Sequence, residues 1–355
     1  MPIGHFTAQN FRCLGRIELD ADPRYNLIYG RNASGKTSIL EAIAYLGRGK
    51  SFRGATTSDL IRHGEREFVL FGLVAAGDRV GRVGVRNSHD GLEIRIDGDN
   101  EGGAAALAMA LPLQIIDPDV HELVAGAPDQ RRRYLDWIAF HVEPDYIDIW
   151  RRFRRVLKQR NAALRANVSG QALEGWNAGF AELAAKVDTG RRRALAAALG
   201  PLRAAGLDLL GSLVDFEYRS GWNEELGLLQ ALEEGADRDR QYGSTQSGPH
   251  RADLKLSYDA RRARKLVSRG QQKLLACAMV LAAAETAQNA LGQPLLLLLD
   301  DPGAELDSDS LARLMQQVAG LGSQVLATSL EADAPLFPAP ARVFHVEHGT
   351  LKQVS

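Results

Sequence analysis

The chain has 355 residues, 45% of them hydrophobic, and a formal net charge of −1 at pH 7. This length gives room for two or three domains with sizeable cores, and the two cysteines, Cys13 and Cys277, form no metal-spaced pair. We expect neither a membrane-spanning run nor a signal peptide, so the composition excludes a membrane protein and indicates the cytoplasm.

The first 120 residues favour a mixed sheet. Short apolar runs such as Phe68–Val74 and Val80–Val85 are separated by Gly, Asp and Asn turn signals, which is typical of strands. Within this block, Tyr25–Tyr29 predicts a strand and Ser38–Leu46 predicts an apolar helix. The glycine-rich segment between them is therefore expected to form a strand-loop-helix turn.

This segment fits the phosphate-loop pattern G-x-x-x-x-G-K-[ST] at every fixed position. We expect its backbone N–H groups to cradle the α- and β-phosphates of ATP, Lys36 to reach the β- and γ-phosphates, and the Thr37 hydroxyl to bind Mg²⁺. The alternative, a chance glycine-rich turn, explains neither flank. The predicted ATP-binding residues of the loop are Gly30, Arg31, Asn32, Ala33, Ser34, Gly35, Lys36, Thr37 and Ser38.

From Pro118 to about Asp239 the apolar spacing becomes that of helices. One helix face is predicted for Trp150, Phe153, Leu157 and Leu164. A second face is predicted for Trp176, Phe180, Leu183 and Val187.

Part of this helical block is strongly basic. Ile149–Leu173 carries seven Lys and Arg residues and no acidic one. Its arginines could lie along the backbone of a DNA duplex, or could pair with nearby acids such as Asp145 and Asp148 on a solvated helix. Helical geometry spreads them around the axis, so they cannot all face DNA. The predicted DNA-contacting set is Arg151, Arg152, Arg154 and Arg155.

Near the other end of the chain, Leu295–Leu299 is apolar at every position, as expected for a parallel strand buried on both faces. It ends at two carboxylates. We predict that Asp300 holds Mg²⁺ and that Asp301 orients and deprotonates the water that attacks ATP. The alternative is a strand that merely ends in a polar turn, which adjacent carboxylates disfavour because they repel each other.

Three further motifs resemble those of ABC-type ATPases. Ser268, Gly270 and Gln271 lie in a Ser-Arg-Gly-Gln segment similar to the signature motif, and Asp307 ends an Ala-Glu-Leu-Asp segment similar to the D-loop. Gln114, after the predicted strand around Leu113, resembles the Q-loop glutamine that senses Mg²⁺ and the γ-phosphate. The resemblance implies that Gln114 is a third Mg²⁺ ligand beside Thr37 and Asp300. The resemblance implies that Ser268 acts in trans, on ATP held by another copy.

A longer series of motifs resembles the RecF family of bacterial recombination mediators, which are related to SMC heads. The series comprises Asn10–Arg12, Leu46–Arg53, Ala127–Asp136, Leu157–Asn161, Gly248–Asp253 and Ser268–Lys273. It implies an α/β ABC-ATPase head, a mixed sheet around the phosphate loop, with an inserted all-helical second lobe. The expected parts are the head at 1–120, the insert at 121–239 and the rest of the head at 240–355.

The resemblance also implies a function. ATP would join two copies into a homodimer on gapped DNA at single-strand to double-strand junctions, where RecR and RecO cooperate with it to load RecA onto strands coated by single-strand-binding protein. This would serve DNA replication, repair and the SOS response. Asp301 stands where many ABC ATPases have glutamate, and Thr328 and Ser329 stand where they have a switch histidine. We therefore expect slow, DNA-dependent hydrolysis that releases the DNA.

Two more arginines are assigned by the same resemblance. Arg53 is expected to contact DNA or the neighbouring nucleotide, with a salt bridge to Asp59 or Glu41 as the alternative. Arg12 is expected on or near the adenine.

Three other functions remain open on the sequence. They are an SMC-like head that partners a nuclease, a transporter ATPase subunit, and a protein in which nucleotide is a structural clamp without turnover. The insert has neither a heptad run nor a zinc-hook cysteine pair, which counts against the first. The missing switch histidine counts against the second.

Overall fold

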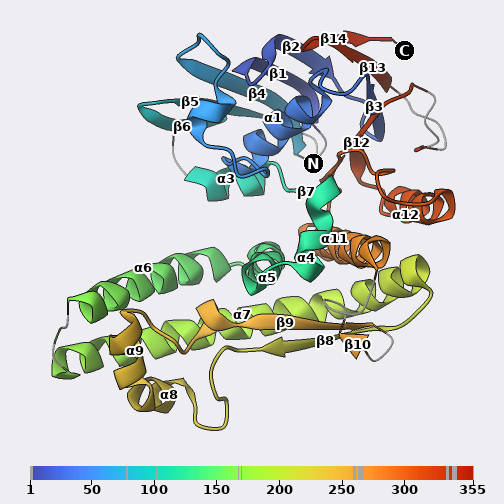
Figure 1. Cartoon of the computed structure of the whole chain (residues 1–355). Coiled ribbons are helices and arrows are strands. Elements are labelled where there is room, and N and C mark those ends of the chain that lie inside the picture. The colour runs from blue at the N-terminus through green and yellow to red at the C-terminus, as the bar shows by residue number, and fades with distance from the viewer. Residues whose placement is uncertain are drawn as a thin grey trace. The chain divides into compact units, whose positions relative to one another are not determined.

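The computed structural model describes residues 3–76, 79–100, 103–166, 168, 170–258, 261–262, 268–332, 336–337 and 342–354. The chain divides into two compact units. We call Met1–Val120 with Leu291–Ser355 the head unit, and His121–Ala290 the insert unit. The elements of each unit are labelled in Figure 1.

The head unit contains two sheets and their connecting helices. In chain order its elements are β1 (Ile3–Phe11), β2 (Leu14–Asp20), β3 (Tyr25–Tyr29), α1 (Lys36–Arg48), α2 (Thr57–Leu60), β4 (Glu67–Ala76), β5 (Arg79–Ser88), β6 (Gly91–Ile96), α3 (Gly103–Ala110), β7 (Leu113–Ile116), the 3₁₀ turn η1 (Pro118–His121), β11 (Leu296–Leu299), α12 (Ser308–Gly320), β12 (Gln324–Ser329), β13 (Arg342–Glu347) and β14 (Thr350–Gln353). The strand and helix predicted on either side of the phosphate loop are therefore β3 and α1.

The two sheets of the head differ in strand direction. One has the order β2-β1-β4-β5-β6 and is antiparallel throughout. The other has the order β14-β13-β3-β12-β11-β7, in which all neighbours are parallel except the β13–β14 pair. The central strand β3 thus pairs with two strands from the far end of the chain. This arrangement confirms the predicted mixed α/β architecture.

Helix α1 joins the two sheets into one core. It contacts β1, β4 and β5 of the antiparallel sheet and β7 and β12 of the parallel sheet. Its buried residues Ile39 and Ile43 share a hydrophobic cluster with Phe6 of β1 and Leu298 of β11. All four residues of β11 are fully buried, as predicted for a central parallel strand. Because these parallel strands end at one edge, the residues that follow them meet there.

The insert unit is mainly helical and also holds a three-stranded antiparallel sheet of order β10-β9-β8. Its elements are α4 (Glu122–Ala125), α5 (Pro128–Val142), α6 (Tyr146–Arg165), α7 (Gly170–Leu210), β8 (Val214–Arg219), α8 (Leu228–Glu234), α9 (Ala236–Tyr242), the 3₁₀ turn η2 (Pro249–Arg251), β9 (Asp253–Tyr258), β10 (Arg261–Arg262) and α11 (Arg269–Leu291).

The expectation of an all-helical lobe was wrong, because the insert unit contains this three-stranded sheet. Strand β8 lies inside the predicted insert and pairs with β9, in register from Val214 opposite Tyr258 to Arg219 opposite Asp253. Because of this pairing, β9 belongs with the insert, and the insert unit extends to Ala290 rather than to residue 239. The alternating residues Val214, Phe216 and Tyr218 are typical of a strand and were missed among strong helix signals.

Helices α6 and α7 pack along each other in the insert unit (Figure 1). Phe153, Leu157 and Leu164 of α6 are buried, which confirms the predicted face. On α7, Phe180 is fully buried, whereas Trp176, predicted to share its face, is 37% exposed. The apolar spacing therefore identified which faces of α6 and α7 are packed, but not how far along each helix the packed face extends.

Among the described residues, one helix, α11, is long and apolar enough to cross a membrane. This corrects the expectation that no run reaches that length. The relevant window is 72% buried inside the protein. A buried helix of this kind is typical of a protein core, because its apolar side chains already have apolar neighbours.

Candidate nucleotide-binding site

The phosphate loop connects the carboxyl end of β3 to the start of α1. Gly35 precedes the first residue of α1 and has φ +115°, a backbone conformation that residues with a side chain rarely adopt. At Gly30 a Cβ would lie 2.3 Å from the carbonyl oxygen of Val346, so only glycine fits there. The first turn of α1 carries no acidic residue. Its free N–H groups and the positive end of the helix dipole therefore form an anion site.

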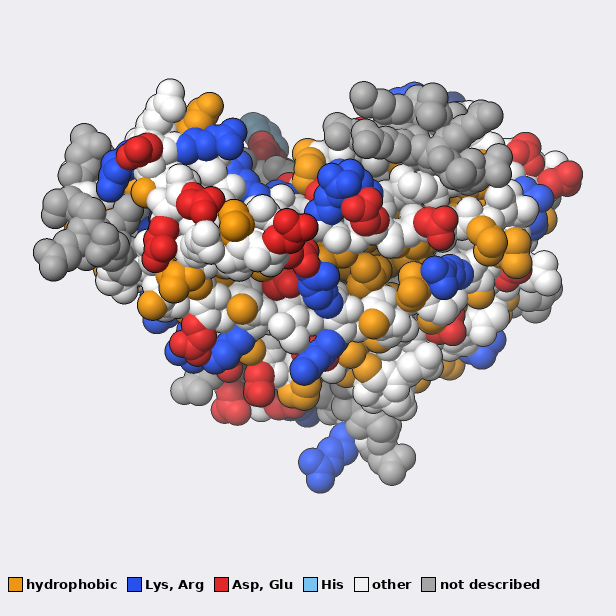
Figure 2. All heavy atoms as spheres, turned by 90° about the horizontal axis from the view of Figure 1, so that it is seen from below, with side chains coloured by type: hydrophobic (Ala, Val, Ile, Leu, Met, Phe, Trp, Pro, Cys, Tyr) orange, Lys and Arg blue, Asp and Glu red, His pale blue; other side chains and the backbone are white. Residues whose placement is uncertain are grey.

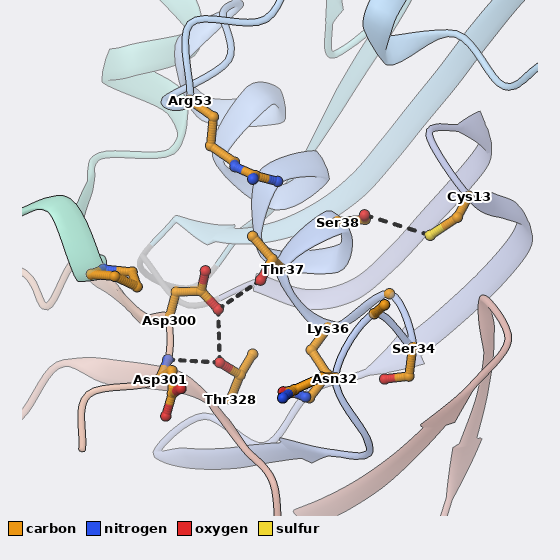
Figure 3. Close-up of a pocket in the computed structure, with 13 residues that line it drawn as sticks. Cys13, Asn32, Ser34, Lys36, Thr37, Ser38, Arg53, Asp300, Asp301 and Thr328 are labelled. Carbon is orange, nitrogen blue, oxygen red and sulfur yellow. Dashed lines mark hydrogen bonds between the residues drawn. The ribbon is translucent and has the colours of Figure 1, made fainter. Parts of the chain in front are cut away.

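A pocket of about 340 Å³ opens over this loop (Figure 3). It gathers segments from both ends of the chain, because β3, β11 and β12 end at the same edge of the sheet. Its lining residues are Cys13, Asn32, Ala33, Ser34, Gly35, Lys36, Thr37, Ser38, Arg53, Pro118, Asp300, Asp301 and Thr328.

Asp300 lies at the centre of the pocket's polar contacts. Its Oδ1 accepts hydrogen bonds from the hydroxyls of Thr37, at 3.1 Å, and Thr328, at 2.9 Å (Figure 3). The Thr328 hydroxyl in turn accepts the backbone N–H of Asp301 at 2.9 Å. Thr328 was considered only as a substitute for a missing histidine, yet it fixes both acids. Thr328 could have been identified from its position near the carboxyl end of β12, because β12 is the parallel neighbour of β11, which ends at the two acids.

The residues fit a Mg²⁺ ion. Neighbouring ligands of an octahedral Mg²⁺, each about 2.1 Å from the metal, lie about 3 Å apart. The Thr37 and Asp300 oxygens are 3.1 Å apart and are both hard donors. Thr37 and Asp300 would therefore hold the ion. Gln114, predicted as a third ligand, does not line the pocket.

Burial shifts the pKa values of Asp300 and Lys36. It raises the pKa of Asp300, against hydrogen bonds from Thr328 and Thr37 that favour the carboxylate. It lowers the pKa of Lys36, against the attraction of Asp301 and Asp300. The Lys36 Nζ donates to the carbonyl oxygens of Gly30 at 2.6 Å and Arg31 at 3.0 Å. Gly30 and Arg31 thus serve the site through their backbone.

Arg53 faces the same pocket. Figure 3 shows its side chain directed toward Thr37, and its charge favours the ionised form of Asp300. The acids that were its alternative partners have other hydrogen bonds: Asp59 accepts from Thr56, and Glu41 accepts from Arg12 and Ser51. Arg53 is thus a lining residue of the nucleotide pocket rather than a partner of either acid.

Arg12 does not line the pocket. Its guanidinium makes a two-pronged contact with Glu41, with Nη2 2.9 Å from Oε1. This hydrogen bond raises the pKa of Arg12. The neighbouring Cys13 lines the pocket instead, with its Sγ 3.5 Å from the Ser38 Oγ.

Gln114 lies inside β7 rather than after it, which corrects the predicted position. It is 8% exposed and pairs in register with Leu297, before the strand ends. Asp117 is the first residue after β7, and the Asp300 N–H donates to the Ile116 carbonyl beside it at 2.8 Å. Burial and repulsion from Asp119 and Asp300 raise the pKa of Asp117 to about 6. Asp117 does not line the pocket, but its carboxylate interacts electrostatically with Asp300, and the sequence analysis did not identify it.

The signature residues do not line this pocket. Ser268 and Gln271 form a capping box at the start of α11: the Ser268 Oγ accepts the Gln271 N–H at 3.2 Å, and the Gln271 Oε1 accepts the Ser268 N–H at 3.0 Å. Gly270 lies in the same first turn, and Ser268 is exposed. Asp307 caps α12, where its Oδ1 accepts the Ser310 N–H at 2.8 Å.

The four arginines of the predicted DNA set are all exposed on α6 of the insert unit. Arg151 approaches Asp148 at 3.4 Å, and Arg154 lies 5.3 Å from the centre of the Trp150 ring. Arg152 and Arg155 form no salt bridge with any described residue. Figure 2 shows basic and acidic side chains interspersed over the face that it displays.

Arg160, part of the same basic stretch, has a structural role. Its side chain is fully buried, and its Nη1 lies 2.7 Å from both the Asp239 carboxylate and the Thr245 hydroxyl. Its Nε donates to Asn177 at 3.1 Å. Arg160 therefore ties α6 to α7 and α9 and is not available to a nucleic acid.

Comparisons with known proteins agree along the whole chain. The family model of the RecF/RecN/SMC N-terminal domain matches residues 2–350. The DNA replication and repair protein RecF of Thioalkalivibrio sulfidiphilus is 39% identical over 99% of both chains, and that of Pseudomonas aeruginosa (strain LESB58) is 38% identical over 97% of this chain and 95% of its own.

Solved structures show the same similarity. The recombination mediator protein RecF-ATP of the RecFOR pathway superposes with a TM-score of 0.90 at 25% identity, covering 99% of this chain and 97% of that one. The expected ABC-ATPase head is thus confirmed together with the resemblance seen in the motifs. The chain belongs to the RecF family of DNA replication and repair proteins.

Proposed function

We propose that this protein is an ATP-dependent DNA-binding switch of recombinational repair, in which bound ATP joins two copies and hydrolysis separates them. The observation that carries the proposal is the pocket, where Lys36 and Thr37 of the phosphate loop meet Asp300 and Asp301 from the far end of the chain. The similarity to a RecF-ATP structure supports ATP as the nucleotide.

The chemistry is the attack of water on the γ-phosphorus, which breaks the bond to the β–γ bridging oxygen and yields ADP and phosphate. Lys36 would exchange its contacts with Gly30 and Arg31 for the β- and γ-phosphates. Asp301 would orient the water and take its proton. When bound, Mg²⁺ supplies positive charge to the phosphate oxygens.

Slow turnover follows from the position of Asp301. Its side chain is one carbon shorter than a glutamate, and its backbone has φ +48° and is tied to Thr328. The carboxylate therefore has a short reach and little freedom to approach the water. A slow reaction suits a timer that sets how long the dimer persists.

The site gains its remaining parts from a second copy. Ser268 and Gly270 lie at the exposed start of a 23-residue helix, where backbone N–H groups favour a phosphate. We propose that this turn binds the γ-phosphate held by Lys36 of the partner copy, with Asp307 in the loop between the two sites. Bound ATP would then bridge the two subunits of a homodimer.

DNA and protein partners complete the proposal. The exposed arginines of α6 would contact phosphates without reading sequence, as suits a protein that acts wherever a gap occurs. The preferred substrate is gapped DNA at a single-strand to double-strand junction, and RecR, RecO and RecA act in the same cytoplasmic pathway during replication, repair and the SOS response. The RecFOR pathway of the similar structure supports these partners.

The test is binding of the full chain to a gapped and an intact duplex with ATP, ADP or no nucleotide, with the mass followed by light scattering in the same samples. We expect a dimer on DNA with ATP alone and a preference for the gap. A chain that stays monomeric and binds DNA equally in all three conditions would refute the switch. Hydrolysis that DNA does not stimulate would favour a transporter-like ATPase.

A further inference from the structure

Glu41 is a completely buried carboxylate on α1, four residues after Thr37. A buried charge is stable only when donors compensate for the water it has lost. Glu41 receives these donors from two different loops, through Arg12 and Ser51. Both loops also form walls of the nucleotide pocket, because Cys13 follows Arg12 and Arg53 lies two residues after Ser51.

The Arg12 contact secures the first wall. Arg12 lies in the turn between β1 and β2 with φ +51°, and its N–H donates to the Leu60 carbonyl at 2.7 Å. Its guanidinium donates hydrogen bonds to both carboxylate oxygens of Glu41. A two-pronged charged contact fixes direction as well as distance. The turn that brings Cys13 to the pocket is therefore anchored to α1.

The Ser51 contact secures the second wall. The Ser51 hydroxyl donates to Glu41 Oε1 at 2.5 Å and accepts the N–H groups of Arg53 at 3.0 Å and Ala55 at 3.2 Å. A hydroxyl has one donor and two acceptor positions, so all of its capacity is used. The buried charge of Glu41 is thereby linked through one side chain to the backbone of Arg53.

This loop needs such an anchor. Gly49 has φ +64° and Gly54 has φ +74°, and a Cβ at Gly54 would meet nothing within 4 Å. Glycines at both ends give the segment large conformational freedom, which binding would otherwise have to remove. The hydrogen bonds of Ser51 remove it beforehand. Arg53 is thus held in place before a nucleotide arrives.

We propose that Glu41 and Ser51 are positioning residues that hold Arg53 toward the terminal phosphate, so that the chain distinguishes ATP from ADP. Arg53 lies over Thr37 and Asp300 (Figure 3), the residues that fit a metal bridging the β- and γ-phosphates. The inference rests on the proposed function, since it takes ATP as the ligand of this pocket. Neither Glu41 nor Ser51 is among the residues that line it.

The experiment compares the affinities of the full chain for ATPγS and ADP, both with Mg²⁺, by calorimetry. In Ser51→Ala the Glu41–Arg12 pair remains, but the link to Arg53 is lost. We expect the preference for ATPγS to fall about tenfold, as for the loss of a hydrogen bond to a charged group, while ADP affinity is retained. Arg53→Ala gives the same fall, and the double variant falls no further.

Three variants sharpen the result. Ser51→Thr keeps the hydroxyl and retains the preference, whereas Glu41→Gln removes the charge and lowers it. Ser58→Ala, an exposed serine of the same segment, leaves it at the wild-type value. A merely structural role for Ser51 would lower the melting temperature without changing the ratio of the two affinities.

The inference is overturned if Ser51→Ala keeps the wild-type preference, or if the effects of Ser51→Ala and Arg53→Ala multiply in the double variant. It is also overturned if Arg53→Ala keeps the preference. In these cases the proposed function stands as long as Lys36→Ala abolishes ATPγS binding. A wild-type chain that binds neither nucleotide would refute both.

Discussion

The Thr37 Oγ1 and the Asp300 Oδ1 lie 3.1 Å apart, although 263 residues separate them in the chain. Thr37 belongs to the first turn of α1, and Asp300 follows the buried strand β11. The contact exists because β3 and β11 are parallel strands of one sheet, with β12 between them. This edge of the sheet is therefore formed by the whole head unit and by neither end of the chain alone.

Asp301→Asn should trap the ATP state. The amide keeps the size of the side chain but cannot take a proton from water, so ATP still binds and is not cleaved. We expect a dimer that persists on gapped DNA for many times the wild-type lifetime, with phosphate release reduced at least about a hundredfold. Light scattering and phosphate release measure the two effects. Asp309→Asn, an exposed carboxylate of α12, is the control. A monomeric Asp301→Asn protein with ATP present contradicts the switch.

Thr328→Val should impair hydrolysis more than binding. The substitution keeps the shape of a fully buried side chain but removes the hydroxyl that joins the Asp300 carboxylate to the Asp301 N–H. Two hydrogen bonds are lost, so we expect the free energy of unfolding to fall by about 1–3 kcal/mol. We also expect ATP affinity within a fewfold of wild type and turnover about tenfold slower, because the acids lose their alignment. Unchanged turnover would remove Thr328 from the site.

Replacing Arg151, Arg152, Arg154 and Arg155 by alanine should reduce the salt dependence of DNA binding. Each phosphate contact contributes about 0.9 to the slope of log affinity against log salt concentration. The side chains point in different directions around α6, so we expect the slope to fall by about 1–3 rather than by the full value for four contacts. Affinity measured at several salt concentrations gives this slope. Arg193→Ala, an exposed arginine of α7, should not change it. A quadruple variant with the wild-type slope would place DNA elsewhere.

His250 should make the insert unit sensitive to acid. Burial lowers its pKa to about 4, against a hydrogen bond to the Thr245 carbonyl that favours the charged form. Between about pH 6.5 and pH 4 the unfolded chain therefore binds a proton that the folded chain does not, so stability falls as pH falls through this range. The loss is at most about 3 kcal/mol. Denaturant unfolding at pH 7 and pH 4 measures it. His250→Gln should flatten the profile, and His63→Gln, an exposed histidine, should not.

The sequence predicted the elements whose signals are local. The phosphate loop, its flanking strand and helix, and the acids after Leu295–Leu299 are each identified within about ten residues. Asp117 and Gln114 show the limit. Which residue ends β7 depends on the register of that strand against β11, a pairing between segments more than 180 residues apart.

The same limit explains the other missed residues. Arg160 has the sequence pattern of a basic surface residue, and its burial depends on Asp239, which the fold brings to it. Glu41 looks like an ordinary helix residue, and nothing within α1 indicates that Arg12 and Ser51 converge on it. Such networks are set by tertiary contacts, which the spacing of residues along one element cannot predict.

The central position of β3 in the parallel sheet affects how the chain folds during synthesis. Its two neighbours in the sheet, β12 and β13, are synthesised about 300 residues later, so the phosphate loop emerges long before its supporting strands exist. The antiparallel sheet and the insert unit have their own partners in the nascent chain and can form first. We expect a truncated product that lacks β12 and β13 to be unable to hold ATP, so that only finished copies would enter the proposed dimer.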